Sequence, residues 1–189
     1  MKKSYLVWIS ALIFILATGQ MLAQEKGGAD RVGGIRLGYH VSQFSDKGEF
    51  LGDPMESFYI GLFRDTKVLP LLHFGTGLEY YKNGMKMVDY ERDLHYLSIP
   101  LDLKLKLGPV FLLTGFSPGF KVAERIIEDG VSEKPADENK AEWFDIPFFV
   151  GGGVKIWFVT LEARYHWGLR EVTDGYMTQS FQIGAGISF

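Results

Sequence analysis

The chain has 189 residues, a formal net charge of −3 and no cysteine. The acidic balance argues against a protein that binds nucleic acid through bulk charge, and the lack of thiols excludes disulfides and thiolate metal sites. The aromatic share of 15% and the 23 glycines are both high, which suits membrane interfaces and crowded barrel interiors.

The first 23 residues have the layout of a secretory signal peptide. Lys2 and Lys3 precede an apolar run, Leu6–Ala17, that is shorter than the roughly 20 residues needed to span a bilayer. We place cleavage after Ala23, with Gly19 as the alternative. Cleavage would remove both lysines, change the formal net charge from −3 to −5 and leave residues 24–189 as one predicted domain.

Eight segments of the remaining chain alternate apolar residues with polar or small ones, as β-strands with two unlike faces do. The clearest is Leu97–Leu107, and the least clear is the start of the fifth segment, where both faces are apolar. Pro100 and Pro147 fall inside predicted strands, so we expect each near a barrel rim or a bulge. The predicted strands are residues 34–41, 57–64, 71–81, 97–107, 110–122, 144–156, 159–169 and 181–189.

The polar faces of these strands mix glycines with charges of both signs. An eight-stranded barrel is only wide enough inside to hold side chains, so small residues and paired charges fit there. We therefore predict that these charges pair in a filled interior; a charge-lined pore is the alternative. The predicted interior charge network consists of Arg36, Glu79, Asp102, Lys104, Glu162 and Arg164.

The connections between the predicted strands alternate in length. Short joins are predicted at Asp65–Pro70, Gly108-Pro109 and Trp157-Phe158, whereas the four remaining connections, residues 42–56, 82–93, 123–143 and 170–176, are longer. Short turns at one end and long loops at the other are typical of outer-membrane barrels. The predicted fold class is thus all-β: one eight-stranded antiparallel up-and-down transmembrane β-barrel in the outer membrane of a Gram-negative cell.

One sequence element resembles a known family. The run from Leu97 to Lys104, followed by Gly108-Pro109, is similar to the "L-x-IP-L-x-L-K … G" strand pair of the PorT-like family of small outer-membrane barrels of Bacteroidetes. The stretches from Leu161 to Leu169 and from Gly184 to Phe189 also resemble the closing strands of that family. The resemblance implies an eight-stranded barrel, brings no catalytic residues with it, and implies a role in protein secretion for some members.

Candidate chemistry is sparse. The four histidines, His40, His73, His95 and His166, lack the close spacing of a metal motif, and three of them lie on predicted inward faces. The His40-Val41-Ser42 triplet resembles the His-x-Ser of barrel lipid A deacylases, but that pair would have to face lipid. We predict no catalytic residue, no cofactor and no metal site, and we interpret the charged segment 124–142 as a solvated loop.

The predicted function is that of a non-enzymatic integral outer-membrane protein with a side-chain-filled lumen and surface loops for interaction. The predicted partners are outer-membrane lipid and extracellular or secretion-machinery proteins, and not nucleic acid. Three alternatives are kept: an accessory subunit of secretion or envelope assembly, a lipid-modifying barrel enzyme, and a soluble lipocalin-like binder.

Overall fold

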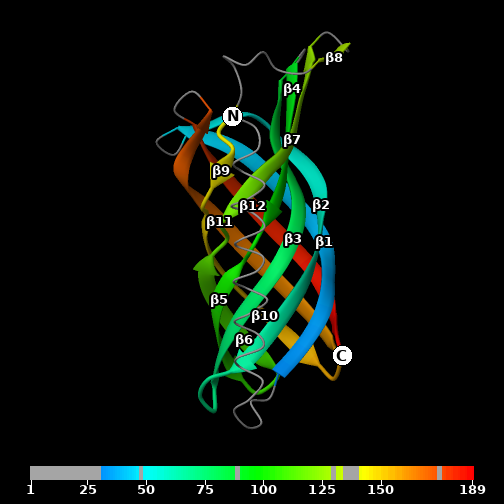
Figure 1. Ribbon diagram of the computed structural model, residues 1–189, viewed down its shortest axis with the longest axis vertical. Helices are drawn as coiled ribbons and strands as arrows, with labels where there is room; N and C mark the ends of the chain where they lie inside the picture. Colours follow the sequence, from blue (N-terminus) through cyan, green and yellow to red (C-terminus); the bar gives the residue numbers. More distant parts are fainter. Residues whose placement is uncertain (1–30, 47–48, 88–89, 129–130, 134–140, 174–175) are drawn as a thin grey trace, which may run out of the picture. The chain divides into compact units, whose positions relative to one another are not determined.

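The structure is a computed structural model that describes residues 31–46, 49–87, 90–128, 131–133, 141–173 and 176–189 (Figure 1). The predicted signal peptide lies outside these residues. No helix in the described ranges is long and apolar enough to cross a membrane. The strands are β1 (Arg31–Asp46), β2 (Glu49–Lys67), β3 (Leu72–Met87), β4 (Tyr90–Ser98), β5 (Leu101–Leu107), β6 (Val110–Phe116), β7 (Gly119–Glu128), β8 (Val131–Glu133), β9 (Phe144–Asp145), β10 (Phe148–Ile156), β11 (Val159–Thr173) and β12 (Tyr176–Ser188).

These strands form an eight-membered antiparallel ring, which confirms the predicted fold class. Three positions in the ring are each built from two consecutive strands: β4 with β5, β6 with β7, and β9 with β10. Pairing runs from β12 through β1, β2 and β3, across the three split positions, to β11 and back to β12. The ring closes between β1 and β12, where Gly34 to Ser45 pair with Ser188 to Met177 without a register shift.

The predicted facing of the strands is also confirmed. Leu37 and Leu103 are 60% and 50% exposed on the outside, whereas their neighbours Arg36 and Lys104 are buried inside. In the ambiguous fifth segment, Phe111 and Leu113 point inward and pack with the buried Phe149. An apolar exterior around a polar interior inverts the pattern of a soluble protein and suits a lipid surrounding.

Prolines interrupt three adjacent positions in the wall. Pro100, Pro118 and Pro147 separate β4 from β5, β6 from β7 and β9 from β10. Each proline carbonyl still accepts a hydrogen bond from a neighbouring strand: from Gly77 N at 3.1 Å, Ile99 N at 2.8 Å and Ser117 N at 2.9 Å, respectively. Pro100 and Pro147 were expected near a rim or a bulge. Strands continue on both sides of each, and the missing N–H donors interrupt the ladder within the wall.

The two ends of the barrel differ. At the turn end, the chain reverses through residues 68–71, Gly108-Pro109 and Trp157-Phe158. At the opposite end, here called the hairpin end, strands continue into the predicted long loops: β1 pairs with β2 as far as Asp46 and Glu49, and β3 with β4 as far as Met87 and Tyr90. Much of what was predicted as loop is therefore paired strand, and β4, β7 and β8 project at this end in Figure 1.

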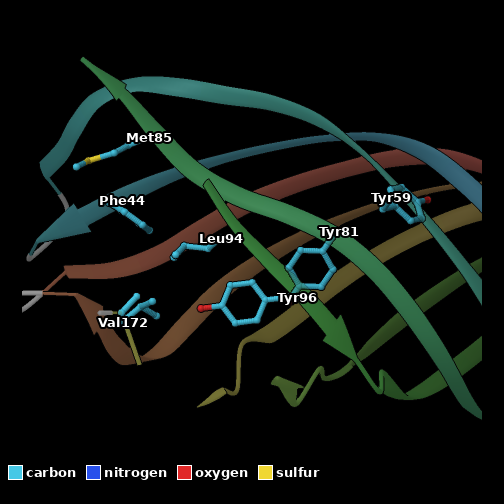
Figure 2. Packing of buried hydrophobic residues seen from close by; sticks show 8 residues of the cluster. Phe44, Tyr59, Tyr81, Met85, Leu94, Tyr96 and Val172 are labelled. Atoms are coloured by element: carbon cyan, nitrogen blue, oxygen red, sulfur yellow. The ribbon is translucent and has the colours of Figure 1, made fainter. Parts of the chain in front are cut away.

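An apolar cluster fills the interior towards the hairpin end (Figure 2). Leu94 and Tyr96 of β4 are fully buried, and they gather with side chains from β1, β2, β3 and β11 and with Ala141. Tyr81 of β3 also belongs to this cluster. The cluster comprises Phe44, Tyr59, Tyr81, Met85, Leu94, Tyr96, Ala141 and Val172, with Tyr176 packed against it.

Candidate functional site in the barrel interior

Four of the six predicted interior charges form one closed cluster. The Arg164 guanidinium donates to Glu79 through Nη2 at 2.6 Å and Nη1 at 3.3 Å, and its Nε lies 3.0 Å from Glu162 Oε1. Arg36 makes ion pairs with the same two acids, from Nε to Glu79 Oε1 at 2.5 Å and from Nη1 to Glu162 Oε1 at 3.4 Å. Each arginine therefore contacts both glutamates, and the four formal charges sum to zero.

We call Arg36, Glu79, Glu162 and Arg164 the central charge cluster. All four are buried, and β1, β3 and β11 supply them because inward-facing residues recur every second position. Isolated charges in such a site would be strongly unfavourable, so their mutual pairing is what makes burial tolerable. As an arrangement of matched charges, the cluster is suited to bracing opposite walls rather than to conducting ions.

Aromatic rings enclose the cations of this cluster. The Arg164 guanidinium carbon lies 5.4 Å from the Tyr59 ring centre and 5.7 Å from that of Phe149, within the range of cation–π attraction. Arg36 lies similarly, at 5.7 Å, over Phe63. The interior is thus packed around the charges by rings as well as by counterions.

Lys104 belongs to a second cluster, nearer the turn end. Its Nζ donates to both carboxylate oxygens of Asp65 at 3.0 Å, and Lys106 Nζ reaches Asp65 Oδ2 at 3.3 Å. Asp65 was predicted to begin a short join, but β2 continues to Lys67 and turns this carboxylate into the lumen. The signal was present in the sequence, because Asp65 continues the inward alternation of Tyr59, Gly61 and Phe63.

Asp102 is not brought into either set of ion pairs. Its carboxylate packs against Gly75 on β3, where a Cβ would lie only 2.4 Å from Asp102 Oδ2. Glycine at position 75 is therefore what makes room for this side chain. Asp102 Oδ1 has no hydrogen-bond partner among the described protein atoms.

Two of the inward-facing histidines, His40 and His166, are hydrogen-bonded to amide side chains. His40 Nε2 lies 2.7 Å from Asn83 Oδ1, and His166 Nε2 lies 3.1 Å from Gln182 Oε1. Since an amide oxygen only accepts, Nε2 of each histidine is the donor. Within the described residues, no group of three or more histidine or carboxylate side chains is placed to hold a metal ion.

Beyond the lipid-facing band, the hairpin end carries its own ion pairs. Arg92 donates to Glu124 Oε1 from Nε at 2.9 Å and from Nη2 at 2.6 Å, and Lys121 contacts the other oxygen of Glu124. Burial raises the pKa of Glu124, but the hydrogen bonds from Lys121 and Arg92 outweigh this and hold the pKa below its ordinary value. Glu124 was predicted to lie in a solvated loop, yet it lies in β7 and is paired.

Asp93 on β4 is paired with cations in a similar way. Its Oδ2 accepts from Arg125 Nη2 at 2.7 Å and from Lys82 Nζ at 3.3 Å. Burial raises the pKa of Asp93, whereas the Arg125 hydrogen bond and the Lys82 charge lower it more, so the carboxylate stays ionised. These contacts tie β3, β4 and β7 together beyond the membrane-facing wall.

Comparison with known proteins shows that the chain is similar to outer-membrane β-barrel proteins. A family model described as "Outer membrane protein beta-barrel domain" matches residues 23–174. A search of curated proteins returns no sequence match. In fold, the chain resembles Ail, the attachment invasion locus protein of Yersinia pestis, which was solved in complex with the heparin analogue sucrose octasulfate. The TM-score is 0.54 and the identity 16%, over 84% of this chain and 99% of Ail. Neisserial surface protein A is also similar, with a TM-score of 0.57 and 13% identity over 87% and 100% of the two chains.

Proposed function

Since this chain belongs to the outer membrane protein β-barrel domain family and is an integral protein of the outer membrane, we propose that it is a non-enzymatic barrel that presents its hairpin end to a protein partner outside the cell. The single observation that carries this proposal is the hairpin end itself. Its strands are paired beyond the lipid-facing band, the buried Arg92–Glu124 and the half-exposed Arg125–Asp93 ion pairs join them, and an apolar cluster packs beneath them. Long hairpins in such barrels lie on the extracellular side.

The packed interior supports a role in binding rather than transport. The apolar cluster and the central charge cluster occupy successive levels of a narrow eight-stranded lumen, and at these levels side chains fill it. A conducting route would have to displace both clusters. We therefore expect no steady conductance from the purified protein in planar bilayers, and a reproducible open level would contradict the proposal.

The partner is tested by cross-linking from the hairpin end in whole cells. A photoreactive residue replaces Lys86, which is half exposed on β3 and pairs only loosely with Glu91 at 3.6 Å. A matched probe replaces the exposed Trp157 at the turn end. We expect a discrete protein adduct from position 86 that position 157 does not give. The same adducts from both positions, or none from position 86, would overturn the assignment of the hairpin end.

A second candidate function is an accessory subunit of secretion or envelope assembly. The PorT-like resemblance favours it, and the most specific residues of that resemblance, Leu97 to Lys104, span the break between β4 and β5 at Pro100. Purification from gently solubilised outer membranes separates the two candidates. Stable recovery with a secretion complex supports the accessory role, whereas recovery of the barrel alone weakens it.

A further inference from the structure

The turn-end half of the lumen contains a cavity that neither charge cluster fills. Its volume is about 180 Å³, and it reaches the turns through Gly108 and Trp157. The share of liquid volume per water is about 30 Å³, so there is room for a small polyatomic anion together with a few waters. In the orientation typical of this fold, the turn end faces the periplasm.

Positive charge dominates the polar lining of this cavity. Lys104 and Lys106 of β5 and Lys155 of β10 all line it, while the carboxylate that faces them is Asp65. Arg36 and Glu162 also line it, but both are engaged in the central charge cluster. The third carboxylate of this half, Asp102, is not part of the lining.

The lysines are not all matched by acids. Lys104 and Lys106 share Asp65, whose two oxygens are both taken by Lys104 at 3.0 Å. Lys155 has no acidic partner within ion-pair distance among the described residues; its Nζ donates to Ser188 Oγ at 3.0 Å. Three ammonium groups and the Asp65 carboxylate thus line the same confined space, where like charges repel more strongly than in water.

We propose that this cavity binds a phosphate-class oxyanion, held by Lys106 and Lys155. Such an anion has several acceptor oxygens for ammonium donors, and charge-assisted hydrogen bonds of this kind are among the strongest in proteins. The hydroxyls of Thr160 and Ser188, which also line the cavity, supply further donors. The phosphate group comes either from free inorganic phosphate or from the headgroup of an anionic lipid in the adjacent leaflet.

Binding is tested on the full mature chain folded in a neutral maltoside detergent. Inorganic phosphate is titrated by calorimetry and by 31P NMR, at constant ionic strength set with chloride. We expect saturable binding at one site. Lys155→Gln and Lys106→Gln should each weaken it about tenfold or more, as loss of a charged hydrogen-bond donor does. Lys86→Gln, at the hairpin end, should leave the affinity unchanged.

Asp65→Asn is expected to change phosphate affinity in the opposite direction. It removes the competing carboxylate while keeping the side-chain shape, so phosphate affinity should rise. Heat-modifiable migration on gels verifies that each variant is folded. Absence of saturable binding of both inorganic phosphate and phosphatidic acid to the folded wild-type protein would overturn the proposal, as would equal weakening of phosphate binding by Lys86→Gln and Lys155→Gln.

The source of the phosphate group is distinguished in phosphatidylcholine vesicles with and without phosphatidic acid. If a lipid headgroup occupies the cavity, phosphatidic acid suppresses phosphate binding and stays with the protein in native mass spectrometry unless Lys155 is replaced. If free phosphate is the ligand, its affinity is the same in both vesicles. Both results support the oxyanion site, and failure of phosphate and of phosphatidic acid to bind would refute it.

Discussion

Arg164 donates two hydrogen bonds to Glu79 straight across the barrel, from β11 to β3. In the ring, β12, β1 and β2 separate these two strands on one side, so the pair joins opposite walls. Arg36 and Glu162 complete the connection from β1 and β11. A contact between opposite walls fixes the barrel cross-section in a way that pairing between neighbouring strands alone does not.

Replacing Glu79 by Gln should strongly destabilise the barrel. The substitution leaves two buried guanidinium groups with Glu162 as their remaining acidic partner in the cluster, and breaking a buried ion pair typically costs about 3–5 kcal/mol. Urea unfolding in lipid vesicles, followed by tryptophan fluorescence, measures the change. The double variant Glu79→Gln, Arg164→Met should recover part of the loss, because it removes the stranded charge. An additive double variant would contradict direct coupling of the two residues.

Leu103→Arg should destabilise the barrel far more than Lys104→Arg. Leu103 faces outward and is half exposed, so its arginine variant would place a charge in the lipid at a cost of about 2–4 kcal/mol near the midplane. Lys104 faces Asp65 inside the barrel, and an arginine at position 104 would still be a cation and keep this ion pair. Folding yields of the two variants in vesicles provide the test, and equal losses would refute the observed facing.

Gly184→Val should be poorly tolerated. A Cβ at position 184 would lie 2.4 Å from both the Leu37 carbonyl oxygen and the Tyr59 hydroxyl. Overpacking of this kind typically costs about 1–3 kcal/mol. The matched control is Ala185→Val, one residue along β12 on the exposed outer face. Urea midpoints in vesicles should separate the two variants; indistinguishable midpoints would show that Tyr59 can move aside.

Acid should loosen the hairpin end before it unfolds the wall. Asp93 and Glu124 have folded-state pKa values below their ordinary values of 3.8 and 4.5. A lowered pKa gives stability that is present above the unfolded-state pKa and is lost as pH falls through the folded-state pKa. The protection factors of β4 and β7 amides against hydrogen exchange, corrected for the intrinsic pH dependence of exchange, should therefore decrease below about pH 4. Asp93→Asn should reduce this pH dependence, whereas Glu91→Gln, a partly exposed neighbour, should not.

The period-two alternation in the sequence predicts the eight wall positions and the facing of their residues, because a lipid-facing strand cannot change face without exposing charge. Exact strand limits are harder to predict. Alternation also continues through Asp65 and beyond Val41, but polar residues there resemble those of turns and loops. The hairpin-end pairing of Asp93 with Arg125 depends on contacts between β4 and β7 that no local pattern reports.

In the interior, too, the facing of residues could be predicted from the sequence, but their contacts could not. Inward facing of Arg36, Glu79, Glu162 and Arg164 follows from alternation, but which charges meet depends on the relative heights of strands that are not adjacent. The partners of Glu162 prove to be Arg36 and Arg164, whereas Lys104 is taken by Asp65. Register between opposite walls follows from ring closure, and one-dimensional patterns do not contain it.

The row of prolines has a mechanical consequence. The junction between the first and last strands, β1 and β12, has twelve consecutive pairs without a shift, whereas the three interrupted strand positions lie across the ring from it. Missing N–H donors reduce the resistance of a ladder to bending. The wall should therefore be stiffest at its closing junction and most compliant at the level of Pro100, Pro118 and Pro147. Under changing lateral pressure in the bilayer, the barrel should deform by hinging along that row while its closure stays intact.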